Sequence, residues 1–186
     1  MNLKIAIFVT VLSVLTLSFH SMANSPLTDE QIAAYSKSSK VQKMIAIAVG
    51  NSSSRTGYCL PAVIKAMSGS GLAPQWWASS PQDHNWYAKY SIPHLEAKER
   101  GFVNLLDTNP NLTPEDAPEG AILVYSGRNP RSTCLDLSPK ATEEQDCGHI
   151  EIRTANGYVS DFVSSSPISD MANSTYKIIG IMVKAL

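Results

Sequence analysis

The chain has 186 residues, with 15 Lys and Arg against 16 Asp and Glu, so its formal net charge is −1. No run of basic residues occurs, alone or interleaved with aromatic residues, so the chain lacks the electrostatic footprint of a nucleic-acid-binding protein. Its hydrophobic content of 44% is that of an ordinary globular protein.

The N-terminus has the layout of a secretory signal peptide. Lys4 precedes an apolar or small run over residues 5–17, and residues 21–23 (Ser-Met-Ala) fit the small-x-small pattern of a cleavage site. That run is too short to span a bilayer comfortably. We therefore predict cleavage after Ala23, one domain over residues 24–186, and a periplasmic or secreted protein. An uncleaved N-terminal anchor is the alternative.

Turn and period signals divide the rest of the chain into helices followed by strands. A capping box over residues 28–31 begins a helical pattern that runs to Val49, with a break near Ser38. Further helices are expected after the breaker-rich loop 51–57 and before Arg100. The predicted strands are residues 102–106, 120–125, 149–154, 158–163 and 176–183, with a hairpin at Asn156-Gly157. With no βαβ alternation, this order predicts an α+β fold.

Three cysteines, an odd number, follow the predicted signal peptide. Cys134 and Cys147 lie in one polar loop and form the natural pair, whose closure would stabilise the fold by about 3 kcal/mol. Cys59 is then left as a free thiol. The non-functional interpretation is that Cys59 is a buried, inert side chain.

Pro61 makes Cys59 a candidate nucleophile. Proline is tolerated only in the first turn of a helix, so this helix begins close to Cys59. The positive end of the helix dipole there favours a thiolate, and the same backbone N–H groups can hold an oxyanion. Gly57 allows the sharp turn into this position.

A thiolate nucleophile requires a base, and His149 is the strongest candidate among the histidines that follow the signal peptide. His84 and His94 lie in the helical region, where a histidine usually serves packing or the surface. His149 follows Gly148 at the start of a strand, where an imidazole can be held rigidly.

A third group should accept the second N–H of the imidazole, and Asp161 on the next predicted strand is the candidate. A two-residue loop at Asn156-Gly157 pairs Asp161 with Ile152 and turns its carboxylate away from His149. A three-residue loop pairs it with Glu151 and brings it to the His149 side. The sequence leaves three alternatives open: Glu151, Ser160 and Asn156.

Three motifs, in this order and at this spacing, resemble those of papain-like peptidoglycan hydrolases. These are the CHAP and NlpC/P60 groups, including the amidase effectors of type VI secretion. The resemblance covers residues 57 to about 163 and rests on Gly57-Tyr58-Cys59, on residues 118–125 (PEGAILVY) and on residues 148–152 (GHIEI).

The resemblance implies a papain-like α+β fold with Cys59 as nucleophile and His149 as base. Asp161 matches the family's third residue by position only. Tyr58 departs from the Asp that NlpC/P60 members usually carry before the cysteine. Ala121 departs from the Asp that CHAP members usually carry after their glycine.

The implied activity is hydrolysis of amide bonds in peptidoglycan, either within stem peptides or at the N-acetylmuramoyl-L-alanine bond. No cofactor or metal is expected, and the protein should act as a monomer. Peptidoglycan or its fragments are the expected partner, and the likeness to the effectors adds an inhibitory immunity protein. The alternatives are a cysteine amidase or transferase acting on another peptide or a lipid, and a non-catalytic exported binding or inhibitor domain.

Other combinations of residues are weaker. Zinc bound by the three cysteines and His149 lacks the usual ligand spacing. The carboxylate pairs Glu143-Glu144 and Asp116/Glu119 fit a solvated surface better than a glycosidase site. The tryptophans at 76, 77 and 86 are core candidates, with a substrate groove as the alternative.

Overall fold

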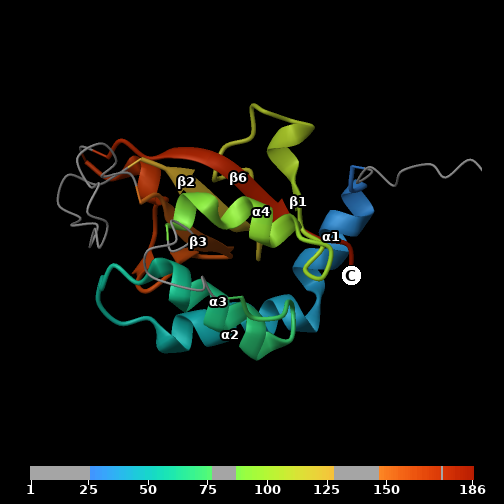
Figure 1. Cartoon of the computed structure of the whole chain (residues 1–186), viewed down its shortest axis with the longest axis horizontal. Helices are drawn as coiled ribbons and strands as arrows, with labels where there is room; N and C mark the ends of the chain where they lie inside the picture. The colour runs from blue at the N-terminus through green and yellow to red at the C-terminus, as the bar shows by residue number, and fades with distance from the viewer. Residues whose placement is uncertain (1–25, 77–86, 128–146, 173) are drawn as a thin grey trace, which may run out of the picture.

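The computed structural model describes residues 26–76, 87–127, 147–172 and 174–186 (Figure 1). The α+β class is confirmed. The helices are α1 (Asp29–Lys37), α2 (Ser39–Asn51), α3 (Cys59–Ser70) and α4 (Ser91–Glu96), with short 3₁₀ turns at Ala88–Tyr90, Leu105–Asp107 and Ile168–Asp170. The strands are β1 (Val103–Asn104), β2 (Ile122–Ser126), β3 (His149–Thr154), β4 (Gly157–Val159), β5 (Val163–Ser164) and β6 (Lys177–Val183).

The first two helices begin and end where their capping residues place them. The backbone N–H of Gln31 donates to Thr28 Oγ1 (3.2 Å), and the backbone N–H of Thr28 donates to Gln31 Oε1 (2.9 Å). This is the predicted capping box. Ser38 ends α1 and caps α2, because its hydroxyl accepts from the backbone N–H of Lys40 (3.3 Å). The predicted break near Ser38 is therefore real.

The strands form one antiparallel sheet in the order β1-β6-β2-β3-β4-β5. Its centre is β2, where residues 122–125 have no exposed surface, so elements of the fold cover both faces of this strand. In the β2–β3 register Tyr125 lies opposite His149, and Leu123 lies opposite Glu151. Residues directly opposite share a face, so His149, Glu151 and Tyr125 project to the same side of the sheet.

The hairpin after β3 differs from both predicted registers. Thr154 pairs with Gly157, so the two loop residues are Ala155 and Asn156. Gly157 is the first residue of β4. Glycine is required there because a Cβ would collide with the carbonyl oxygen of Ser164 in β5, and because the φ of this residue is +141°. The glycine thus serves the close approach of β5 rather than the hairpin turn.

The predicted strand 158–163 is interrupted by a tight turn. Val159 of β4 pairs with Val163 of β5, and the backbone N–H of Ser160 donates to the Phe162 carbonyl (2.9 Å). Asp161 therefore lies at a turn between two strands instead of within one. The predicted strand 102–106 is likewise shorter, because Asn104 caps a 3₁₀ turn at residue 105.

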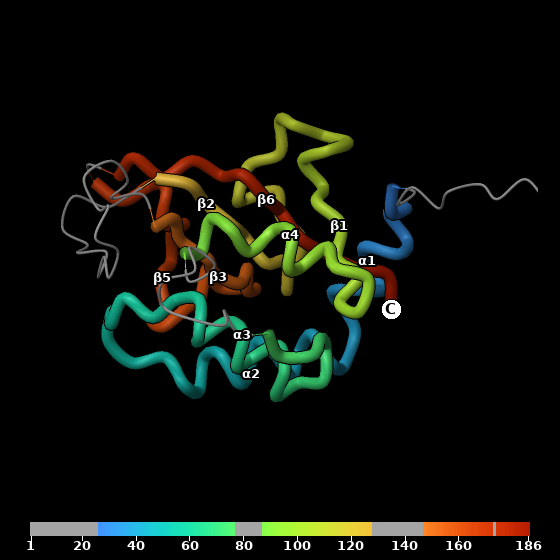
Figure 2. The backbone as a smooth tube through the Cα atoms, viewed as in Figure 1, coloured from blue at the N-terminus to red at the C-terminus, as the bar shows by residue number. Residues whose placement is uncertain are grey.

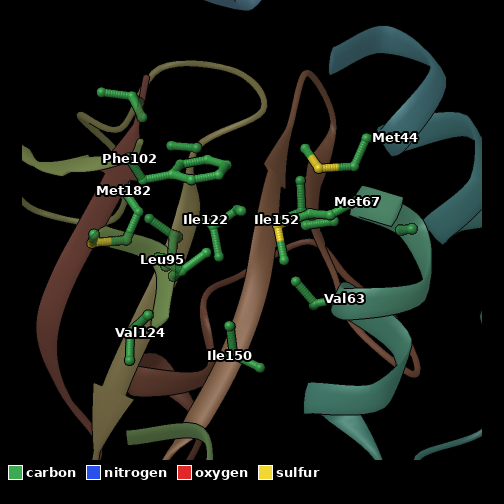
Figure 3. Packing of buried hydrophobic residues seen from close by; sticks show 14 of the residues in the cluster. Met44, Val63, Met67, Leu95, Phe102, Ile122, Val124, Ile150, Ile152 and Met182 are labelled. Carbon is green, nitrogen blue, oxygen red and sulfur yellow. The ribbon is translucent and has the colours of Figure 1, made fainter. Parts of the chain in front are cut away.

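Helix α3 is attached to the sheet through an apolar core. It contacts both α2 and β3, and Figure 3 shows Met44, Val63 and Met67 of the two helices gathered beside Ile152 of β3. All of these side chains are fully or almost fully buried. This packing fixes the helix that carries Cys59 against the strand that carries His149.

Replacing Met67 with Ala should lower the free energy of unfolding by about 2–5 kcal/mol, because the change leaves a cavity between α3 and β3. Urea titration followed by circular dichroism measures the effect. Lys65→Ala, on the exposed face of the same helix, should change stability by less than about 0.5 kcal/mol. Equal effects of the two changes would contradict the packing described.

Candidate functional site

Cys59 is the first residue of α3 and is a free, half-buried thiol. The first hydrogen bond of this helix runs from the Ala62 N–H to the Tyr58 carbonyl (3.1 Å). The backbone N–H groups of Cys59 and Leu60 therefore precede the helical ladder, and Pro61 has no N–H. The helix start predicted from Pro61 is confirmed, and its amides point away from the helix beside the thiol.

His149 is the first residue of β3, and the preceding glycine fixes its approach. Gly148 has φ +66°, and a Cβ at this position would collide with the Tyr125 carbonyl oxygen and lie 2.6 Å from the Lys89 backbone nitrogen. Only glycine fits this conformation and this space. The imidazole is 5% exposed and lies among three aromatic rings, with centroids 6.2, 6.0 and 5.9 Å away: Tyr125, Phe162 and Tyr176.

The structure brings Cys59 and His149 together. The Cys59 side chain lies within hydrogen-bonding reach of the imidazole and interacts with it electrostatically. Burial alone would lower the pKa of His149, but Cys59 first and Glu151 second outweigh it and raise that pKa to about 10. An imidazolium is therefore favoured at neutral pH, which suits a thiolate partner.

Glu151 occupies the place next to the imidazole that was predicted for Asp161. Its Oε2 lies 3.4 Å from His149 Nε2. Among the described residues Nε2 has no hydrogen-bond partner of good geometry, so this contact is an ion pair rather than a formed hydrogen bond. Because Nε2 faces Glu151, Nδ1 is the nitrogen left to face Cys59.

Two donors hold the Glu151 carboxyl group inside the protein, where it is 1% exposed. The Tyr125 hydroxyl donates to Oε1 (2.7 Å), and the Ile168 backbone N–H donates to the same oxygen (3.3 Å). Oε2 is thereby left to face the imidazole. Burial and the neighbouring Glu151 carboxylate raise the pKa of Tyr125 well above its usual value, so its hydroxyl stays protonated as the donor.

Asp161 binds the loop before Cys59 instead of the imidazole. Its Oδ2 accepts from the Thr56 N–H (2.6 Å), the Thr56 hydroxyl (2.8 Å) and the Gly57 N–H (2.9 Å). Its carbonyl accepts from the Ser53 N–H (3.1 Å). The β4–β5 turn thus ties down the α2–α3 loop, which lies next to it in Figure 2, and this loop leads directly into Cys59.

The expected pairing of Asp161 with the imidazole was wrong because the hairpin register was wrong. Of the alternatives, Ser160 donates to Asp161 Oδ1 (3.1 Å), Asn156 lies in the hairpin loop, and Glu151 contacts the ring. The i, i+2 spacing of His149 and Glu151 on one strand puts both on one face, and this signal would have favoured Glu151. The supporting donors Tyr125 and Ile168 left no comparable signal.

The other candidate residues lie elsewhere or outside the described residues. His94 stacks on Trp76 (centroids 6.0 Å apart) in a structural contact, so this tryptophan is a core residue. The predicted signal peptide, His84, Trp77, Trp86, Glu143, Glu144 and Cys134 all fall outside the described ranges, so the Cys134–Cys147 disulfide stays a prediction. The described residues contain no cluster of three or more potential metal ligands.

No protein-family model, curated protein or solved structure matches this chain. The assignment of a function therefore depends on the geometry of its own residues. None of the helices in the described ranges combines the length and apolar character needed to cross a bilayer.

Replacing Cys59 with Ala should lower the pKa of His149, because Cys59 is the largest of the contributions that raise it. NMR titration of the imidazole measures the shift. In the native protein this group stabilises the fold at low pH, and that stabilisation is lost as the pH rises through about 10. An unchanged His149 titration in Cys59→Ala would show that the two side chains do not interact.

Replacing Asp161 with Asn should destabilise the protein most at neutral pH. Burial alone would raise the pKa of Asp161, but hydrogen bonds from Thr56 and Ser160 outweigh it and lower that pKa. The stabilisation is therefore present above the pKa of the unfolded chain and is lost as the pH falls through the folded value. Denaturant unfolding at pH 3 to 7 should show the difference from wild type shrinking towards low pH. The exposed Asp170→Asn should show a small difference at every pH.

Proposed function

We propose that this protein is an exported cysteine hydrolase that cleaves amide bonds in peptidoglycan, within stem peptides or at their junction with muramic acid. One observation carries the proposal. The thiol at the start of α3 lies against an imidazole whose other nitrogen faces a buried carboxyl group. A nucleophile, a base and an orienting group in this order are the parts that nucleophilic acyl transfer requires.

In the proposed reaction, His149 holds the proton of Cys59 as an imidazolium, and the thiolate attacks the carbonyl carbon of the amide. The N–H groups of Cys59 and Leu60, which precede the helical hydrogen bonds, stabilise the oxyanion that forms. The C–N bond then breaks as His149 returns the proton to the leaving amine. Water attacks the resulting thioester, with His149 again as base, and releases the carboxylic acid and the thiol.

Glu151 serves this reaction by holding the imidazole in one orientation and by stabilising its charged form. The aromatic rings around His149 keep water from its faces, which strengthens both of its ionic interactions. Asp161 and Thr56 fix the loop that presents the thiol. Each of these groups acts on geometry or charge, and Cys59 alone forms the covalent bond.

The choice of peptidoglycan rests on the sequence. The order and spacing of the motifs around Cys59, residues 118–125 and His149 resemble those of CHAP and NlpC/P60 hydrolases, and the N-terminus resembles a signal peptide. A helix that carries the cysteine, packed against a strand that carries the histidine, is also the arrangement of papain-like enzymes. We propose that fold relationship as well, with peptidoglycan fragments as substrate and no metal required.

Incubation of purified sacculi with the protein, followed by mass spectrometry of the released muropeptides, tests the proposal. Cys59→Ala should abolish release, and Glu151→Gln should reduce the rate by more than about tenfold, because the imidazole loses its orienting charge. The exposed Glu30→Gln should release fragments at the wild-type rate.

The masses of the fragments identify the cleaved bond. Release that persists in Cys59→Ala would remove the mechanism. Intact sacculi, together with a Cys59 thiol that reacts no faster with iodoacetamide than free cysteine, would favour a non-catalytic binding domain. A fast-reacting thiol without release would indicate another amide as the substrate.

A further inference from the structure

Arg55 is an exposed cation that the proposed reaction does not use. It lies in the α2–α3 loop, four residues before Cys59, and next to the loop residues that Asp161 holds. Its guanidinium carbon lies 4.3 Å from the centroid of the Phe162 ring, and Nη2 contacts the Met171 sulfur. These contacts hold the guanidinium in one place.

Phe162 links Arg55 to the candidate active site. The Phe162 ring, which supports the guanidinium, also lies 6.0 Å from the His149 ring, centroid to centroid. One aromatic side chain therefore contacts both the exposed cation and the imidazole. Because Cys59 interacts with the same imidazole, the charge of Arg55 lies in the neighbourhood of the thiol.

Nothing in the described part of the chain neutralises Arg55. Within those ranges it contacts an aromatic ring and a thioether, and no carboxylate there forms an ion pair with it. The carboxylate of Asp161, in the same turn as Phe162, is already bonded by Thr56, Gly57 and Ser160. A guanidinium fixed on apolar groups keeps its forked N–H donors available for a planar anion such as a carboxylate.

Two exposed apolar side chains lie close in the sequence to the residues of this neighbourhood. Tyr58 precedes Cys59 and is 56% exposed, and Val163 follows Phe162 and is also 56% exposed. Apolar contact area near a fixed cation suits a ligand that combines apolar groups with a carboxylate, as a peptide with a free carboxylate does.

We infer that Arg55 binds a substrate carboxylate close to the scissile amide, so that the substrates are acidic peptides. The inference rests on the proposed cysteine hydrolase function and narrows it. Peptidoglycan stem peptides fit this class because they carry free carboxylates beside their amide bonds. Amidation of such a carboxylate to a carboxamide would then make a stem peptide a poor substrate.

A pair of alkylating agents tests the charge next to the thiol without any substrate. Iodoacetate and iodoacetamide form the same S–C bond with Cys59 and expel iodide, and they differ in one negative charge. The ratio of their rate constants should fall by about threefold or more in Arg55→Gln. It should stay near the wild-type value in Arg55→Lys, and in Lys43→Gln, which removes an exposed cation from α2. A ratio that is unchanged in Arg55→Gln would overturn the inference while leaving the proposed function intact.

A matched pair of substrates tests recognition itself. The probes are a synthetic muramoyl tripeptide with a free carboxylate on its second residue and the same compound with a carboxamide there. The wild type should favour the carboxylate in kcat/KM by about ten- to a hundredfold, and Arg55→Gln should bring that ratio close to one. Arg55→Lys should give an intermediate ratio, because it keeps the charge but loses the fork.

The two hypotheses fail in different ways. Cys59-dependent turnover with no preference for the carboxylate, or with the same preference in Arg55→Gln, would overturn only the role of Arg55. No Cys59-dependent turnover of either probe or of sacculi would overturn the proposed function, and this inference with it.

Discussion

The buried carboxyl group of Glu151 sets the conditions that the rest of the site must meet. A charged group removed from water is costly unless partners compensate it, and here the compensation comes from a hydroxyl, a backbone N–H and an imidazole. The first two both bond Oε1, so Oε2 is left facing His149. The pair therefore acts as a unit, because removing either member would leave the other buried without its partner. This requirement explains why Tyr125 stands opposite His149 in the sheet, where its hydroxyl reaches the carboxyl group.

The thiol reaches the same place through a separate part of the chain. Helix α3 packs on β3 through apolar side chains, which position the helix. Asp161 fixes the loop before Cys59 by accepting hydrogen bonds from the backbone N–H groups of Thr56 and Gly57. Since β4 is hydrogen-bonded to β3, the turn that holds the thiol loop belongs to the same sheet as the histidine. The same sheet therefore positions both the nucleophile and the base, although they lie ninety positions apart in the sequence.

The positions of Cys59 and His149 within their elements could be predicted from neighbouring residues. The side chain that contacts the imidazole depended on the pairing of strands, which could not. Pro61 limits where α3 can begin, and this places Cys59 at the start of the helix. Gly148 adopts a backbone conformation that only glycine fits, and this places His149 at the start of β3. The role of Asp161 could not be obtained in this way. Asn156-Gly157 has the composition of a hairpin turn, but the approach of Ser164 in β5 requires the glycine inside the strand. A contact from the next strand thus moved the register, and with it the side chain expected at the imidazole.

The site contains a buried ion pair, His149 with Glu151, and an exposed cation, Arg55. The two respond differently to added salt. His149 and Glu151 are almost fully buried, so added salt changes their interaction little, and the orientation of the imidazole should hold across ionic strengths. Arg55 is exposed, and its attraction for an incoming carboxylate is screened over about 8 Å at physiological ionic strength. In the scheme proposed here, salt therefore weakens the capture of an acidic substrate without disturbing the chemical step. The two tasks fall to different side chains, the exposed Arg55 and the buried His149, and both of these pack against the same aromatic ring, that of Phe162.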